Sequence, residues 1–198
     1  MNMIKEWPPC QVFYIESMLT ICESVRNSHE MITIKRKDPI LYNFGVNDYL
    51  DQFQNIIQQA AALSRYFWPS YNKDKNKNEI FQKRGEYLRE YFDMSENNPL
   101  KNRELRNAIE HFDENLDLYL QKPIAGEFFP NYVGKKPDEN HQNCKFFRAY
   151  FTDTEEFEVL GKKFHVVLLI NEIIRIYNHL LIDNETGGVL SNPVKKII

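Results

Sequence analysis

The sequence predicts an all-α protein, an up-and-down bundle of four to five helices with a small β-meander insert before the last helix. Apolar residues recur every three or four positions over most of the chain, whereas strand-like patterning is concentrated in 146–167. The hydrophobic fraction of 42% and the aromatic fraction of 14% can fill a core. The 198 residues fit one domain, 1–198, in which 46–122 and 167–183 supply the bundle helices.

The N-terminal part of the chain predicts two helices separated by a strand. Val12 to Val25 has apolar residues at helical spacing and predicts the first helix. Met31 to Lys37 alternates between apolar and polar residues and predicts a short strand. A second helix is expected to begin at Asn47 or Asp48, because either side chain can cap it, and to end at Trp68.

Two more helices are expected in the middle of the chain. Residues 71–78 are rich in Lys and Asn and predict a loop, after which 79–94 has a helical apolar face. The turn at 97–99 can restart a helix, because proline is tolerated in a first turn. The fourth helix is therefore expected over 99–122, ending before Pro123.

The last third of the chain predicts the β insert and the final helix. Residues 123–145 contain Gly, Pro, Asn and Lys and predict a loop. Three short strands follow, near 146–152, 156–160 and 163–167, with a turn at Gly161. A fifth helix is expected from Val167 to Ile182.

Charge, cysteine content and hydropathy limit the class of protein. A net charge of −3 argues against coating nucleic acid through bulk positive charge. Three widely spaced cysteines argue against a disulfide framework and favour a reducing compartment. No apolar run reaches the roughly 18 residues of a membrane span, and the first residues lack a signal-peptide pattern. We therefore expect a cytoplasmic protein with no membrane partner.

The fourth predicted helix carries an unusual polar face. Its apolar residues form one stripe, expected to pack in the core: Leu105, Ile109, Phe112, Leu116, Tyr119 and Leu120. Arg106, Asn107 and His111 fall outside that stripe. Leu118, seven residues after His111, is an apolar residue on the polar side, which predicts that a second copy of the chain covers this face.

This polar face resembles a known family. Arg106, followed by the polar Asn107 and four residues later by His111, resembles the R-x4–6-H motif of HEPN-domain proteins. The resemblance covers the helices of 47–122 and 167–183. It implies a metal-independent endoribonuclease without cofactors, acting as a homodimer on RNA in a toxin–antitoxin or phage-defence context. An antitoxin or a nucleotidyltransferase is the partner protein that the resemblance implies.

The resemblance also implies catalytic roles for the three motif residues. His111 would be the general acid or base, Arg106 would stabilise charge on the scissile phosphate, and Asn107 would orient one of them. The chemistry is sound, because histidine titrates near neutral pH and arginine offers a fork of donors to phosphate. One antitoxin-controlled subgroup carries Tyr two residues after the His; this chain has Asp113 there, so regulation by modifying such a Tyr is not expected.

Other polar residues are weaker candidates. A basic run could bind RNA phosphates, or belong to a solvated loop: Lys73, Lys75, Lys77, Lys83 and Arg84. Arg175 on the last helix could line the same groove as the motif, or be a surface residue. His141 and Cys144 have zinc-like spacing, but further ligands at such spacing are missing and no metal site is expected.

Two other functions stay open. The chain could be a non-catalytic HEPN-like helical module that binds a nucleotide or a protein partner, as its low basicity suggests. It could also be a helical interaction domain unrelated to that family, which would be favoured if His111 lay in the core.

Overall fold

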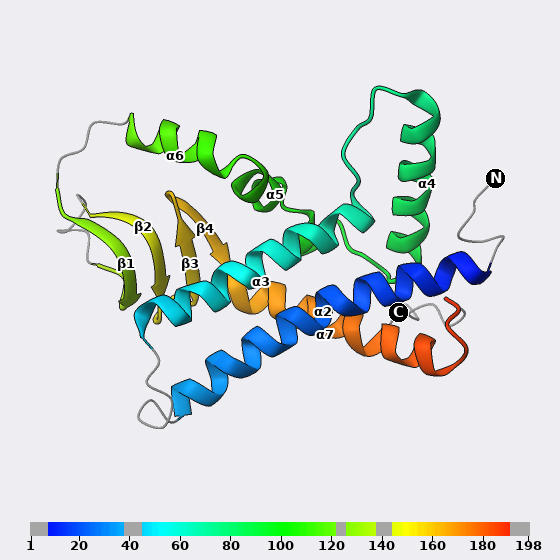
Figure 1. Cartoon of the computed structure of the whole chain (residues 1–198), viewed down its shortest axis with the longest axis horizontal. Helices are drawn as coiled ribbons and strands as arrows, with labels where there is room; N and C mark the ends of the chain where they lie inside the picture. Colours follow the sequence, from blue (N-terminus) through cyan, green and yellow to red (C-terminus); the bar gives the residue numbers. More distant parts are fainter. Residues whose placement is uncertain (1–7, 38–44, 122–125, 138–143, 191–198) are drawn as a thin grey trace.

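The computed structural model describes residues 8–37, 45–121, 126–137 and 144–190. Within these ranges it combines six α-helices with a four-stranded mixed sheet (Figure 1). The prediction of an all-α bundle is therefore wrong, and the fold is mixed α and β. The sheet is larger than the predicted meander because a further strand pairs with it from a segment that lacks clear strand patterning.

Three long helices pack together as the helical core. They are α2 (Pro8–Lys37), α3 (Val46–Phe67) and α7 (Val166–Glu185). Their fully buried side chains include Ile15, Met18, Ile56, Ile57, Ile173 and Ile176. The predicted strand at Met31–Lys37 is wrong: these residues are the last turns of α2, where Ile32 is buried in the core. Packing of the helix face outweighs the local β preference of this stretch.

The helix α4 (Lys75–Tyr91) begins four residues earlier than predicted. Asp74 caps it, because its carboxylate accepts the backbone N–H groups of Asn76 (3.0 Å) and Lys77 (3.3 Å). Gly85 lets α4 approach the end of α3 closely: a Cβ atom there would lie 2.6 Å from the Phe67 carbonyl oxygen.

The predicted fourth helix is not continuous. It consists of a 3-10 turn, η1 (Pro99–Lys101), and two short helices, α5 (Arg103–Glu110) and α6 (Phe112–Leu120). Asn102 separates the first two, and its side chain accepts the N–H of Glu104 at 2.9 Å. His111 separates α5 from α6, with φ −124° and ψ 45°, which is not helical backbone.

The sheet has the order β1-β2-β3-β4. Its strands are β1 (Phe128–Gly134), β2 (Lys145–Phe151), β3 (Glu156–Val159) and β4 (Lys162–His165). The meander β2-β3-β4 confirms the three predicted strands, with Gly161 in the left-handed conformation at the turn (φ +77°). The predicted loop over 123–145 is wrong where it includes β1, which pairs with β2 in parallel.

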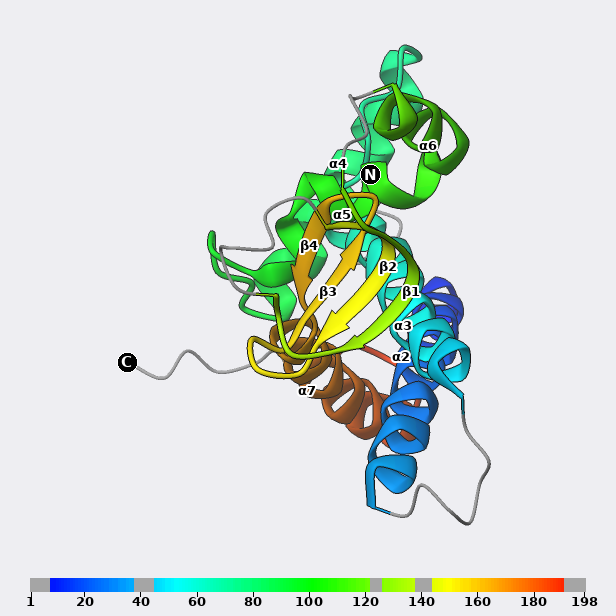
Figure 2. The same ribbon diagram turned by 90° about the vertical axis from the view of Figure 1, so that its left-hand side faces the viewer.

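The sheet lies at one end of the molecule, beside the N-terminal half of α3 (Figures 1 and 2). The rings of Phe53 on α3 and Tyr150 on β2 stack with their centroids 4.0 Å apart. Arg148 reaches from β2 to α3, and its Nη1 donates to Asp51 Oδ1 (2.5 Å) and Gln54 Oε1 (2.9 Å). Aromatic stacking and an ion pair thus fix the sheet to the helical core.

Only part of the predicted apolar stripe on the fourth helix lies in the core. Leu105 is fully buried, whereas Leu120 is 53% exposed; the side chain of Ile109 lies outside the described residues. The half-buried Tyr119 turns to the sheet, and its hydroxyl donates to the Phe146 carbonyl oxygen at 3.1 Å. Beyond the break at His111, α6 contacts the sheet through Tyr119 and through Phe112, whose ring centroid lies 6.0 Å from that of Phe147.

Candidate functional site

The break at His111 brings the three motif residues to one pocket. Arg106, Asn107 and His111 line a pocket of about 440 Å³ together with Arg103. On an unbroken helix the side chains of Arg106 and His111 would diverge by about 140°. The non-helical backbone at His111 changes this direction, and both side chains reach the same cavity.

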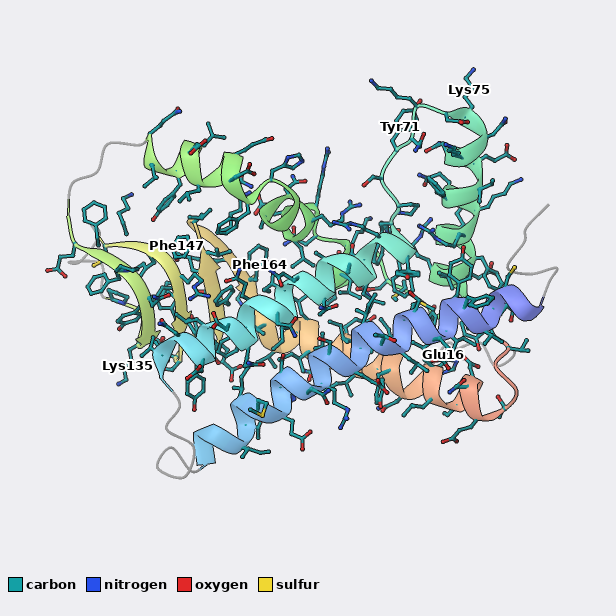
Figure 3. The ribbon with its side chains drawn as sticks, viewed as in Figure 1. Glu16, Tyr71, Lys75, Lys135, Phe147 and Phe164 are labelled. Carbon is teal, nitrogen blue, oxygen red and sulfur yellow. The ribbon has the colours of Figure 1, made fainter. Side chains whose placement is uncertain are left out.

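The opposite wall of this pocket is the connector between α3 and α4, defined here as residues 68–74. Its residues Pro69, Ser70 and Tyr71 line the pocket. In Figure 3 the connector, which carries Tyr71, runs between α5 and α4. Arg106 ties α5 to this connector, because its Nη1 donates to the Trp68 carbonyl oxygen at 2.7 Å. The half-buried Arg106 therefore forms part of the inner wall of the pocket.

His111 lies at the open side of the pocket. Its side chain is 55% exposed, and Nδ1 lies 3.4 Å from Glu114 Oε2 one turn further along α6. An exposed pair of this kind contributes little to stability, but it limits the orientations of the imidazole ring. The histidine is thus outside the hydrophobic core and accessible from solvent.

A second pocket of about 420 Å³ lies against the same connector. It shares Pro69, Ser70 and Tyr71 with the first pocket, and its other lining residues are Arg65, Asn72, Phe81 and Arg84. Arg84 is held in place: its Nη2 donates to the Arg65 carbonyl oxygen at 2.9 Å, and its guanidinium lies 5.7 Å from the Tyr66 ring centroid. We call the two pockets together the connector groove.

The connector groove is positively charged in a protein whose net charge is −3. Its charged side chains, among the described lining residues, are Arg65, Arg84, Arg103 and Arg106, and no Asp or Glu accompanies them there. His111 adds a group that can take up a proton. Arginine is well suited to phosphate oxygens because its planar guanidinium offers paired donors. The arrangement fits an anionic ligand that carries phosphate.

Sequence reasoning did not identify three of these groove residues. Arg65, Tyr71 and Arg103 come from α3, the connector and α5, so no local spacing joins them. Arg84 on α4 belongs to the basic run that the sequence offers for phosphate contacts. For these three residues, the local signal was an aromatic residue, Tyr71, in a connector that is otherwise mostly polar.

The predicted RNA-binding residues do not all join the groove. Lys73, on the connector, and Lys75, the first residue of α4, are exposed near Tyr71 but do not line either pocket. Arg175 lies elsewhere, in a separate pocket of about 870 Å³, where its Nη2 donates to Glu172 Oε1 at 2.7 Å. The hydrogen bond that Arg175 donates to this carboxylate raises the pKa of the guanidinium. Arg175 therefore does not share a groove with the motif.

The described residues offer no group of three or more His, Cys, Asp or Glu side chains placed to hold a metal ion. His141, half of the weak zinc-like pair, lies outside the described ranges, and Cys144 is half-buried. Among the helices of the described ranges, none has the length and apolar character that crossing a membrane requires.

Comparison of the chain with models of protein families, with curated proteins and with solved structures finds no match. Function must therefore be argued from the site itself.

Proposed function

We propose that this protein is a metal-independent endoribonuclease that cleaves RNA in the connector groove. The observation that carries the proposal is that Arg106, Asn107 and His111 line one pocket, with the imidazole exposed and an arginine on the inner wall. This is the set of groups that the sequence resemblance to HEPN proteins requires. The surrounding arginines favour a phosphate-bearing substrate.

RNA supplies its own nucleophile, so the chain has only to move protons and stabilise charge. The 2′-hydroxyl oxygen attacks the adjacent phosphorus and the bond from phosphorus to the 5′-oxygen breaks, which leaves a 2′,3′-cyclic phosphate and a 5′-hydroxyl. One proton leaves the 2′-oxygen and one is added to the 5′-oxygen. His111 performs one of these transfers, since imidazole is both acid and base near neutral pH. Arg106 and Arg103 stabilise the negative charge that develops on the phosphate oxygens.

A second copy of the chain would complete the site. Each chain contributes one motif histidine, while the reaction needs a proton acceptor and a proton donor. The exposed position of His111 and the 60% exposure of Leu118 on α6 favour a homodimer in which two α5–α6 segments face each other. We propose the cytoplasm as its compartment and toxin–antitoxin or phage-defence activity as its context, with an antitoxin or a nucleotidyltransferase as a further partner.

The test is RNA cleavage by the purified protein in EDTA. His111→Ala should lower the rate at least about a hundredfold, because general acid–base catalysis contributes roughly that much or more. His165→Ala is the matched control: His165 is 64% exposed and lies 3.8 Å from Glu156, much as His111 lies beside Glu114. Its rate should equal that of the wild type. Equal cleavage by wild type and His111→Ala, or no cleavage by the wild type, would contradict the proposal.

A specific contact favours the alternative, a non-catalytic module that binds a nucleotide in the same groove. The bond from Arg106 to the Trp68 carbonyl oxygen gives this arginine a structural task as well. A wild-type protein that binds RNA or a nucleotide but never cleaves it would support this second function.

A further inference from the structure

Tyr71 occupies an unusual position for an aromatic side chain. It is 76% exposed, and it lines both pockets of the connector groove. The connector that carries it has its own hydrogen bonds: Asn72 N–H donates to Asn78 Oδ1 (3.0 Å), and Asp74 N–H donates to Asn72 Oδ1 (2.9 Å). The phenol ring is thus exposed to solvent on a connector whose backbone is held by hydrogen bonds.

The pocket beyond Tyr71 contains groups that suit a phosphate. Arg84 lies near two aromatic rings, with its guanidinium 5.7 Å from the centroids of Tyr66 and Phe81. Arg65 is exposed on the same wall. An aromatic ring beside two arginines matches the usual means of binding single-stranded nucleic acid, in which bases stack on aromatic side chains and cations follow the backbone.

We propose that this second pocket is a binding subsite for the nucleotide next to the scissile phosphate of a single-stranded RNA. The base stacks on Tyr71, and the phosphate contacts Arg65 and Arg84. Because the two pockets share the wall formed by residues 69–71, one strand can fill both. This inference rests on the proposed function, which identifies RNA as the strand that enters the groove. Duplex RNA is excluded as a ligand, because its paired bases cannot stack on a side chain.

Binding of an RNA that cannot be cleaved tests this subsite separately from catalysis. The probe is a fluorescein-labelled single-stranded hexanucleotide with 2′-O-methyl groups throughout, titrated by fluorescence anisotropy in EDTA at low salt. Tyr71→Ala should weaken binding at least about fivefold, as expected for loss of one stacked base. Tyr71→Phe keeps the ring and should bind like the wild type. Phe13→Ala, at a residue 77% exposed on α2, is the matched aromatic control and should have no effect.

The salt dependence of binding tests the arginines. Arg65→Gln should lower the slope of log affinity against log salt concentration by about 0.7, the value for one phosphate contact on a single strand. Arg26→Gln, at an exposed arginine on α2, should leave that slope unchanged. An unlabelled single strand should displace the probe, and a duplex of the same sequence should not.

The outcomes separate the two proposals. If the wild type does not bind the probe, if Tyr71→Ala binds like the wild type, if Tyr71→Phe binds as weakly as Tyr71→Ala, or if the duplex competes equally, the subsite is overturned. If binding depends on Tyr71 but no RNA is ever cleaved, the subsite stands and the ribonuclease proposal fails.

Discussion

The buried carboxylate of Asp183 should make the stability of this protein depend on pH in a direction that the structure determines. Asp183 is completely buried near the end of α7, where its Oδ1 accepts a hydrogen bond of 2.7 Å from the hydroxyl of Tyr91 on α4. Its other oxygen, Oδ2, has no hydrogen-bond partner among the described residues. Burial raises the pKa of Asp183 above its ordinary value of 3.8, and the Tyr91 hydrogen bond and the charge of His179 oppose this only in part.

The direction of this pH dependence follows from the linkage between protonation of Asp183 and folding. Above pH 3.8 the unfolded chain loses the Asp183 proton while the folded chain still holds it, so the free energy of unfolding falls as pH rises. The free energy of unfolding stops falling once the pH exceeds the raised pKa that Asp183 has in the folded state. Each pKa unit of difference corresponds to about 1.4 kcal/mol. Asp183→Asn keeps the acceptor for Tyr91 but cannot ionise, so it lacks this loss of stability.

The measurement is urea unfolding followed by circular dichroism, for wild type and Asp183→Asn, between about pH 3 and 8. The stability of the variant minus that of the wild type should increase as pH rises, and then level off. Groups with a lowered pKa, such as Glu156 beside Lys136, destabilise both proteins equally in acid and cancel in this difference. A constant or decreasing difference for Asp183→Asn would refute the reasoning.

Two further predictions follow from close packing and from burial. Gly85→Ala should destabilise the protein by at least about 1 kcal/mol in urea unfolding, because the new Cβ would meet the Phe67 carbonyl oxygen at 2.6 Å. This loss should outweigh the better helix propensity of alanine. A urea midpoint equal to or higher than that of the wild type would contradict this prediction. Burial raises the pKa of Cys22 to about 12, whereas Cys10 and Cys144 are half-buried. A thiol reagent should therefore label Cys10 and Cys144 in the folded protein, and Cys22 only after unfolding. Rapid labelling of all three would show that the interior around Cys22 is open.

The sequence by itself determined the elements whose signal is local. The helices α3 and α7 and the strands β2 to β4 were predicted close to their observed bounds, because apolar periodicity records which face of an element is buried. The polar face that carries Arg106 and His111 was visible for the same reason. An apolar stripe on one side of a helix leaves the other side for polar groups.

Tertiary contacts alone decided the features that depend on distant segments. The strand β1 contains Pro130, Asn131 and Gly134, which weaken any strand pattern, and it forms because β2 offers an edge with which it can pair in parallel. The helix breaks at His111, and beyond the break the Tyr119 hydroxyl of α6 donates to the Phe146 carbonyl oxygen of the sheet. The periodicity of a single segment predicts neither of these contacts.

The residues of the connector groove could likewise be predicted only in part from the sequence. The motif of Arg106, Asn107 and His111 was readable because its residues lie within six positions of one another. Most of its surroundings were not, since Arg65 and Tyr71 lie on segments that meet α5 only after the chain has folded. Local spacing records which side chains share a face, whereas a cavity is made by the faces of different elements, and only their packing brings those together.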